Sequence, residues 1–389
     1  MLPAFPSAFK LGRWSRLAIL PVLLLLAACQ TGGNSSGAAG PGRVQVALLV
    51  PSGSPDHNVN QVAASLSQAA QLAVSERGGD LVDLRIYSTA GDAAQAASVA
   101  QQAVNEGANV ILGPLYAQNA AAVGRAVAGR GVSVLSFSNN TDIAGGNVFV
   151  LGNTFENTAR RVADFAARRG KGRMIVVHGQ TPAETFAKDA VAKVAPSTRA
   201  SVVGSIGFEF SQEGVNTATP QIITTAQTQG AQAILLTSDT GGALPAITGA
   251  LKDNGLPEVV QLIGLTRWDI PSSATSLPGL QNGWFALPNT ATVSLFNTKF
   301  AQAFGVNPHP TAAFAYDGMA LIAKQAKRSG PSGMTPNALI GAGSFDGATG
   351  QVRLLTDGTN DRALAIGTIR NNSVLILDQA PTNLGTTGL

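Results

Sequence analysis

The sequence predicts an α/β protein built from two doubly wound, parallel-sheet lobes. Two observations support this fold class. Short runs rich in Val, Ile and Leu alternate with longer Ala-rich stretches from Arg43 onward, and this alternation begins a second time near Asn157. The short runs are apolar at almost every position, which is typical of strands buried on both faces of a parallel sheet between helices.

The first strand–helix series runs from Val44 to Leu135. Its strands are predicted from continuous apolar runs, and its helices from apolar residues at helical spacing, such as Val62, Leu66 and Ala69. Asp92 is expected to cap a helix. The predicted elements are strand 44–50, helix 61–77, strand 81–87, helix 92–106, strand 109–112, helix 118–128 and strand 132–135.

The second series repeats this pattern, and the pattern changes after Gly264. Its predicted elements are helix 157–168, strand 173–178, helix 183–194, strand 201–208, helix 217–229, strand 231–236, helix 242–252 and strand 259–263. Beyond it we expect strand 284–287, helices 292–304 and 311–328, and strands 352–355, 363–369 and 373–377. A tail that leaves helices for a hairpin suggests that the chain returns to an earlier sheet.

The N-terminus is typical of an export signal. Three basic residues precede an uncharged run of 12 residues, 17–28, and a membrane-spanning helix needs roughly 18 or more. The run ends in Leu26-Ala27-Ala28-Cys29, which resembles the bacterial lipobox, in which the cysteine thiol is acylated. We therefore predict a signal peptide over 1–28 and a lipidated Cys29 followed by a flexible tether, 29–42; the alternative is a signal peptide with an incidental cysteine.

Charge and cysteine content exclude several classes of protein. The chain has 26 basic and 22 acidic residues, and the signal contains three of the basic ones, so the mature charge is 23 − 22 = +1. No basic stripe remains, so no nucleic-acid partner is expected. Cys29 is the single cysteine, so stability must come from the core rather than from a disulfide.

Motifs for catalysis are missing from the sequence. The three histidines do not have metal-ligand spacing, no Gly-x-Ser-x-Gly elbow occurs, and Gly170-Lys171-Gly172 lacks the other residues of a phosphate loop. We expect no catalytic residue, no metal and no cofactor. The sequence therefore predicts a binding module rather than an enzyme.

Polar loops follow the predicted strands at their carboxyl ends, where ligands bind in open α/β sheets. They are 52–54, 115–119, 136–140, 178–181, 238–240 and 266–268. Their hydroxyls, amides and backbone N–H groups suit a small polar or anionic ligand. The alternative is that these Ser, Thr and Asn residues merely cap the helices that follow.

Five segments together resemble a type I periplasmic binding protein of the leucine-binding kind. They are 46–51, 110–115, 136–140, 315–320 and 345–350. The resemblance implies a three-crossover hinge between the lobes and a ligand caught by hinge closure. We place the crossovers near Asn153, Gly283 and Gly343, each to within several residues. Lobe 1 then comprises 43–152 plus 284–342, lobe 2 comprises 153–283 plus 343–378, and 379–389 is a disordered tail.

The same resemblance implies roles for individual residues. By position, Ser136 and Ser138 would bind a ligand carboxylate and Glu156 an ammonium group. A second acid has no counterpart because 264–267 occupies that stretch, which argues against ordinary amino-acid binding. His178 is a ligand contact or a solvated strand end, and Tyr116 and Trp268 cover a ligand or pack at the lobe interface. The candidate ligand-binding residues are Ser52, Ser54, Leu115, Tyr116, Ser136, Ser138, Asn139, Glu156, His178, Thr266 and Trp268.

Two functional hypotheses follow. Segment 113–119 is similar to a loop of lipoprotein activators of penicillin-binding proteins, which implies a bifunctional peptidoglycan synthase as partner. Acyl chains on Cys29 would hold the protein at the periplasmic side of the envelope. Gln30, in place of aspartate, favours the outer membrane. The alternative is the substrate-binding component of an ABC transporter for branched-chain amino acids or a similar small polar ligand.

Overall fold

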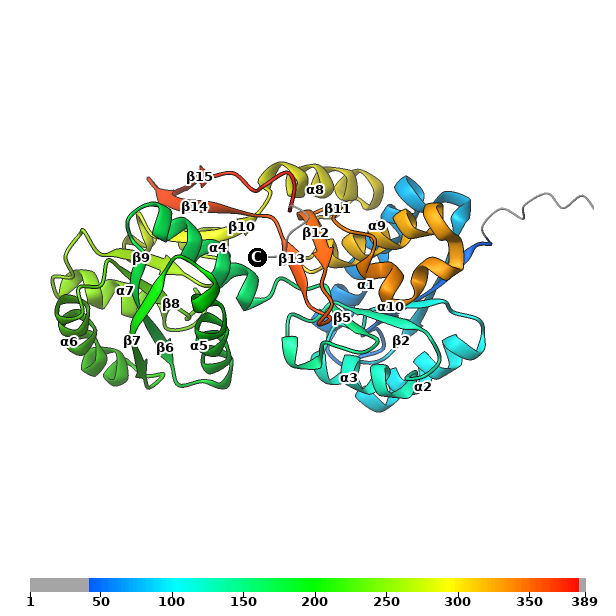
Figure 1. Ribbon diagram of the computed structural model, residues 1–389, viewed down its shortest axis with the longest axis horizontal. Helices are drawn as coiled ribbons and strands as arrows, with labels where there is room; N and C mark the ends of the chain where they lie inside the picture. Colours follow the sequence, from blue (N-terminus) through cyan, green and yellow to red (C-terminus); the bar gives the residue numbers. More distant parts are fainter. Residues whose placement is uncertain (1–41, 385–389) are drawn as a thin grey trace, which may run out of the picture. The chain divides into compact units, whose positions relative to one another are not determined.

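The first lobe is built on a parallel five-stranded sheet. The computed structural model describes residues 42–384, so the predicted export signal and Cys29 lie outside the described residues (Figure 1). The strand order is β2-β1-β3-β4-β5, a doubly wound arrangement. The strands are β1 (Val44–Val50), β2 (Val82–Ser88), β3 (Val110–Leu112), β4 (Ser133–Ser136) and β5 (Val148–Val150).

Helices cover both faces of this sheet because successive strand residues point to opposite sides. Val46 and Leu48 of β1 belong to the core under α1 and α9, whereas Ala47 and Leu49 belong to the core under α2 and α3. The helices are α1 (His57–Ala73), α2 (Ala93–Asn105), α3 (Ala117–Ala126), α8 (Thr290–Phe304), α9 (Ala312–Ser329) and α10 (Pro336–Ile340).

The second lobe repeats the strand order of the first and then extends it. Its sheet runs β15-β14-β10-β9-β8-β6-β7, so the five parallel strands β7-β6-β8-β9-β10 have the order of the first lobe, and β14 and β15 join antiparallel. The strands are β6 (Arg173–Gly179), β7 (Ser201–Phe208), β8 (Ala233–Leu236), β9 (Gln261–Gly264), β10 (Trp284–Pro288), β14 (Leu364–Arg370) and β15 (Ser373–Asp378). The predicted α/β class with parallel-sheet lobes is confirmed.

Four helices pack on the second sheet, two on each face. Ile234 and Leu236 of β8 face α6 and α7, and Ala233 and Leu235 face α4 and α5. Side chains before the helices cap them; Thr154 and Thr181, for example, accept backbone N–H bonds at the starts of α4 and α5. The helices are α4 (Phe155–Arg168), α5 (Pro182–Val194), α6 (Gln212–Thr228) and α7 (Leu244–Asp253). Within residues 42–384, no helix combines the length and apolarity needed to cross a bilayer.

A small antiparallel sheet lies after α10, and it changes the predicted lobe assignment. It consists of β11 (Phe345–Gly347), β12 (Gly350–Leu354) and β13 (Asn360–Arg362). Phe345, Val352 and Leu354 are buried in the first-lobe core. Residues 345–362 therefore pack with the first lobe, not with the second as expected, and the third crossover lies between Arg362 and Leu364 rather than near Gly343.

The second crossover also lies later than expected. β10 pairs with β9 and β14, so it is a strand of the second lobe, and the chain crosses between Pro288 and Thr290 instead of near Gly283. The first crossover joins β5 to α4 through residues 151–154. The predicted disorder of the tail is wrong for residues 379–384, because Ala380 is buried and Leu384 packs against the second-lobe core; 385–389 lie outside the described residues.

Side chains of β13, just before the third crossover, form hydrogen bonds with the backbone of the first crossover. Asn360 Nδ2 donates to the carbonyl oxygens of Val150 (2.8 Å) and Gly152 (2.9 Å), and Asn157 Nδ2 donates to Asn360 Oδ1 (3.0 Å). The buried Arg362 donates through Nη2 to the carbonyl of Leu151. The hinge therefore has a hydrogen-bonded centre in which two crossovers are joined.

Candidate functional site

The first-lobe serines expected to face a ligand are bonded within their own loops. Ser136 is fully buried; its Oγ donates to Pro114 O (3.0 Å) and accepts from Ser138 N (3.1 Å). A serine hydroxyl has one proton, so Ser136 has none left for a ligand carboxylate in this conformation. Ser138 Oγ accepts from Asn140 N (3.1 Å), and Asn139 between them is exposed.

The loop after β1 also bonds its polar groups locally, whereas the loop after β3 contributes packing and a helix start. The Oγ atoms of Ser52 and Ser88 lie 2.6 Å apart, and Ser54 Oγ accepts from Asp56 N (3.2 Å) in the turn before α1. Leu115 packs against the first-lobe core, and Tyr116 occupies the N-cap position of α3. The N-cap of α1 is Asp56 and not Ser54, so Ser54 supports the turn before the helix, and its role in ligand binding stays a prediction.

Glu156, the residue expected to bind an ammonium group, already has partners in this chain. Thr141 Oγ1 donates to its Oε1 (3.0 Å), and Lys193 Nζ lies 3.5 Å from the same oxygen. The side chain is 12% exposed, and its other oxygen, Oε2, is buried with no hydrogen-bond partner. Thr141 belongs to the first lobe and Lys193 to the second, so Glu156 links the lobes beside the first crossover.

Trp268 is a core residue of the second lobe, which corrects both of its predicted roles, as a ligand cover and as packing at the lobe interface. Its side chain is fully buried and stacks on Phe285 with ring centroids 6.4 Å apart. The ring fits because two neighbours are glycines: a Cβ at Gly264 or Gly283 would lie 2.1 or 1.9 Å from the indole. A ligand between the lobes therefore has no contact with this side chain.

The other two predicted residues of the second lobe lie at the carboxyl edge of its sheet. His178 is half-buried at the end of β6, with Nδ1 3.1 Å from Gly179 O. Thr266 Oγ1 donates to Ser238 O (3.0 Å) and so joins the loops after β9 and β8. Both side chains are placed where the sequence predicted, and their role in ligand binding stays a prediction.

Glu184 is a polar anchor that the sequence reasoning missed. Its Oε2 accepts three hydrogen bonds, from Gly179 N (2.7 Å), Thr237 Oγ1 (2.8 Å) and Ser238 Oγ (2.6 Å). These donors lie at the end of β6 and directly after β8, where the strand order of the second lobe reverses and where doubly wound folds bind ligands. The available signal was the spacing Thr181-x-x-Glu184 of a capping box at the start of α5.

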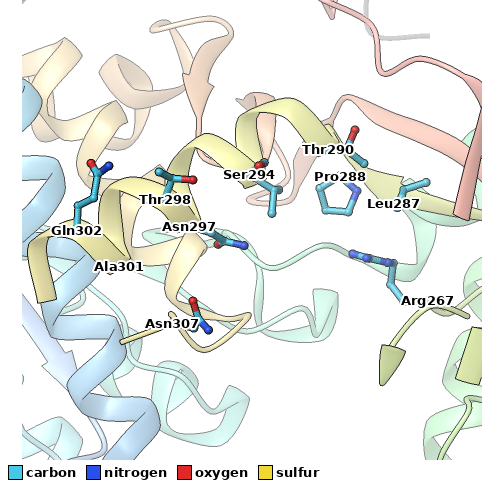
Figure 2. A pocket seen from close by; sticks show the side chains of 11 residues that line it. Arg267, Leu287, Pro288, Thr290, Ser294, Asn297, Thr298, Ala301, Gln302 and Asn307 are labelled. Carbon is cyan, nitrogen blue, oxygen red and sulfur yellow. The ribbon is translucent and has the colours of Figure 1, made fainter. Parts of the chain in front are cut away.

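A cavity of about 660 Å³ lies between the loop after β9 and one face of α8. We call it the Arg267 cavity (Figure 2). In this view the guanidinium of Arg267 and the amide of Asn297 point toward one another across the space. Its lining is Arg267, Leu287, Pro288, Thr290, Val293, Ser294, Asn297, Thr298, Ala301, Gln302 and Asn307. Second-lobe and first-lobe residues thus share one cavity beside the second crossover.

Sequence reasoning did not identify this cavity, although part of its pattern was readable. Thr290, Ser294, Asn297 and Thr298 recur at three- and four-residue spacing, which places them on one face of α8. A polar helix face is ordinarily solvated, however, and the sequence does not show that Arg267 lies opposite it. Among residues 42–384, no group of three or more His, Cys, Asp and Glu side chains is arranged to hold a metal ion.

Comparisons with solved structures agree with this architecture. A putative branched-chain amino acid ABC transporter protein from Rhodospirillum rubrum matches with a TM-score of 0.73 at 18% identity, covering 86% of this chain and 100% of that one. A branched-chain amino acid transporter substrate-binding protein from Streptococcus pneumoniae, in complex with isoleucine, matches with a TM-score of 0.58 at 17% identity, with coverages of 87% and 100%.

A third solved structure has a different kind of ligand. It is an ABC transporter solute-binding protein from R. palustris in complex with benzoate, with a TM-score of 0.57, 17% identity and coverages of 87% and 97%. No curated protein shows significant sequence similarity to this chain. The family model "Periplasmic binding protein" matches residues 43–373, and on that match the chain belongs to the periplasmic binding protein family.

Proposed function

We propose that this chain is the solute-binding component of an uptake transporter and that it binds a small polar ligand between its lobes. The observation that carries the proposal is the Arg267 cavity, because its walls come from both lobes beside a crossover. Its volume is within the roughly 300–1,000 Å³ of small-molecule sites. Hinge closure would then change the cavity walls relative to each other, which is how a ligand selects the closed state.

The proposed location follows from the predicted export signal. The chain would act on the periplasmic side of the envelope, held by acyl chains on Cys29, with the outer membrane as the expected anchor site. We propose binding without catalysis, since the described polar groups at the sheet edges hold the fold together: Ser136 donates to Pro114 O, and Thr237 and Ser238 donate to Glu184 at the start of α5.

Penicillin-binding protein activation remains the second candidate. It is supported by the predicted acyl anchor, by segment 113–119, and by the hydrogen bond from Ser136 to Pro114 O, which leaves this first-lobe hydroxyl without a proton for a ligand carboxylate. In that case the partner would be a bifunctional peptidoglycan synthase, bound by protein–protein contact.

The test compares small-molecule binding with synthase binding. The detergent-solubilised full chain is heated with leucine, isoleucine, valine or benzoate in excess. A ligand at a hundred times its Kd adds about 2.7 kcal/mol, which raises Tm by roughly 4 °C for a folded part the size of residues 42–384. Co-purification with a synthase and no Tm shift with any compound would replace the transporter proposal by the activator one.

Two tryptophan variants locate the site. Ser294→Trp places a large ring in the Arg267 cavity and should abolish the Tm shift. Leu295→Trp is the matched control, because Leu295 is the next residue of α8, is exposed and does not line the cavity. Equal effects of the two variants on the Tm shift would contradict the proposed site.

A further inference from the structure

Arg267 is the single charged side chain among the described residues that line the Arg267 cavity. The remaining polar groups are hydroxyls and amides, which donate and accept, and the apolar wall consists of Leu287, Pro288, Val293 and Ala301. A guanidinium has five N–H donors and no acceptor. The chemistry of the cavity is therefore biased toward a ligand group that accepts hydrogen bonds.

Asp269 fixes the orientation of this guanidinium. Arg267 Nε donates to Asp269 Oδ1 (2.6 Å) and Nη2 to Oδ2 (2.5 Å), a two-bond fork. Asp269 is 13% exposed and does not line the cavity. The fork takes two of the five N–H groups and does not involve Nη1, so Arg267 keeps donors for a second planar acceptor while its rotamer is fixed.

The pairing also decides how the cavity discriminates between ligands. Asp269 balances the charge of Arg267, so a ligand is selected mainly by hydrogen-bond geometry and less by a long-range field. A carboxylate matches the guanidinium edge with two acceptors. An ammonium group would meet the Arg267 cation and only neutral hydroxyl and amide acceptors, with no carboxylate among the lining residues to compensate its desolvation.

We infer that the ligand is a small organic carboxylate without an ammonium group beside it, and that Arg267 binds its carboxylate through the edge not used by Asp269. The hydrocarbon part would lie along the apolar wall at Leu287, Pro288 and Val293. This inference rests on the proposed function and adds to it the chemical class of the solute.

Matched probes test the inference by calorimetry and thermal shift on the full chain. Isocaproate is leucine without its ammonium group, and isoamylamine is leucine without its carboxylate; benzoate and benzylamine form an aromatic pair. We expect binding of isocaproate, benzoate or both, weaker or absent binding of leucine, and no binding of either amine. Binding of leucine or an amine in preference to both carboxylates would overturn the inference.

Substitutions at Arg267 then test the contact itself. Arg267→Gln should weaken carboxylate binding by about ten- to a hundredfold, because a charge-assisted hydrogen bond is lost, and Arg267→Lys should weaken it less. The double variant Arg267→Gln, Asp269→Asn avoids an unpaired Asp269 and should bind as poorly as Arg267→Gln. Arg85→Gln is the matched control, since Arg85 pairs with Asp83, two residues away, outside the cavity.

The outcomes separate the two proposals. If leucine binds and Arg267→Gln leaves its affinity unchanged, the carboxylate inference fails and solute binding stands. If Arg267→Gln leaves carboxylate affinity within twofold of the unsubstituted chain, the contact with Arg267 is wrong. If none of the amino acids, carboxylates and amines binds, both the inference and the solute-binding proposal fail.

Discussion

The two lobes share a strand order but differ in the extra strands and the polar groups that stabilise them. Both contain five parallel strands in equivalent order, β2-β1-β3-β4-β5 and β7-β6-β8-β9-β10. The first lobe adds the separate sheet β11–β13 and a buried ion pair between Asp317 and Arg362. The second adds β14 and β15 to its own sheet, and Glu184 joins the loops after β6 and β8. Two lobes with the same strand order are therefore stabilised by different polar groups, the Asp317–Arg362 pair in the first and Glu184 in the second.

The ion pair of Asp317 and Arg362, which we call the first-lobe anchor, brings the separated segments 315–320 and 345–350 into contact in the fold. Asp317 on α9 accepts hydrogen bonds from Ala348 N (2.6 Å), Thr349 Oγ1 (2.7 Å) and Arg362 Nη1 (2.8 Å). A Cβ at Gly347 would lie 2.2 Å from Asp317 Oδ1, so the turn needs glycine to approach the carboxylate. The carboxylate thus joins α9, the β11–β12 turn and the third crossover.

The largest effect is expected at this anchor. Arg362→Met should lower the free energy of unfolding by about 3–5 kcal/mol, because it leaves Asp317 as an uncompensated buried charge. Asp317 and Arg362 side chains are 0% and 2% exposed. Urea unfolding monitored by circular dichroism measures the loss. Arg85→Met is the control: that arginine is 47% exposed in its pairs, so its loss should cost under about 1 kcal/mol.

The double variant Asp317→Leu, Arg362→Met tests whether the lost stability comes from the unpaired charge of Asp317. Replacing both partners by apolar residues removes the unpaired charge, so part of the lost stability should return. A cost for Arg362→Met no greater than that for Arg85→Met would show that the ion pair does not anchor the first lobe.

The second-lobe anchor should give an intermediate effect. Glu184→Ala removes the acceptor of three hydrogen bonds and should cost about 1.5–3 kcal/mol, the range for bonds to a charged group. Urea unfolding again measures it. Glu213→Ala is the matched control, because Glu213 also lies in the first turn of a second-lobe helix but is exposed. Equal costs would mean that Glu184 acts through the helix dipole alone, worth about 0.3–1 kcal/mol.

The central strands of both sheets were accessible from sequence because strands such as β3 and β8 are buried on both faces and therefore apolar throughout. The lobe to which the late strands belong was not accessible. β10 has the same apolar pattern whichever sheet it joins, and its partner β14 is about eighty residues away, with Trp284 opposite Thr368. The three-residue strand β11 contains Asp346 and has too few residues to show alternation.

Site residues were less accessible because their roles depend on partners remote in sequence. Trp268 stands in a loop at the predicted ligand edge, and only the space left by Gly264 and Gly283 places it in the core. Ser136 has the expected position, but its hydroxyl donates its hydrogen bond to the carbonyl of Pro114 and not to a ligand. Arg267 belonged to the stretch that lacked an expected acid, and its position opposite α8 required the second crossover to be placed correctly.

The smallest effect concerns the acid sensitivity of the first lobe. Burial raises the pKa of Glu76, but its hydrogen bond with Tyr316 and its ion pair with Lys299 (2.9 Å) outweigh burial and hold the pKa below its ordinary value. The unfolded chain therefore binds a proton before the folded one does as pH falls. Stability from this carboxylate is complete above the ordinary glutamate pKa of about 4.3 and is lost as pH falls through the lower native pKa.

Glu76→Gln should therefore lower the free energy of unfolding at pH 7 by at most about 1 kcal/mol, since the pair with Lys299 is partly exposed. The difference from the unsubstituted chain should shrink as urea unfolding is repeated at successively lower pH, because protonation of the folded state removes the contribution of the charge. Glu258→Gln, at an exposed residue of the second lobe, is the control. A difference that stays constant as the pH is lowered from 7 through the acid range would mean that the side chain of Glu76 stabilises the first lobe through packing, since a contribution from its charge must disappear on protonation.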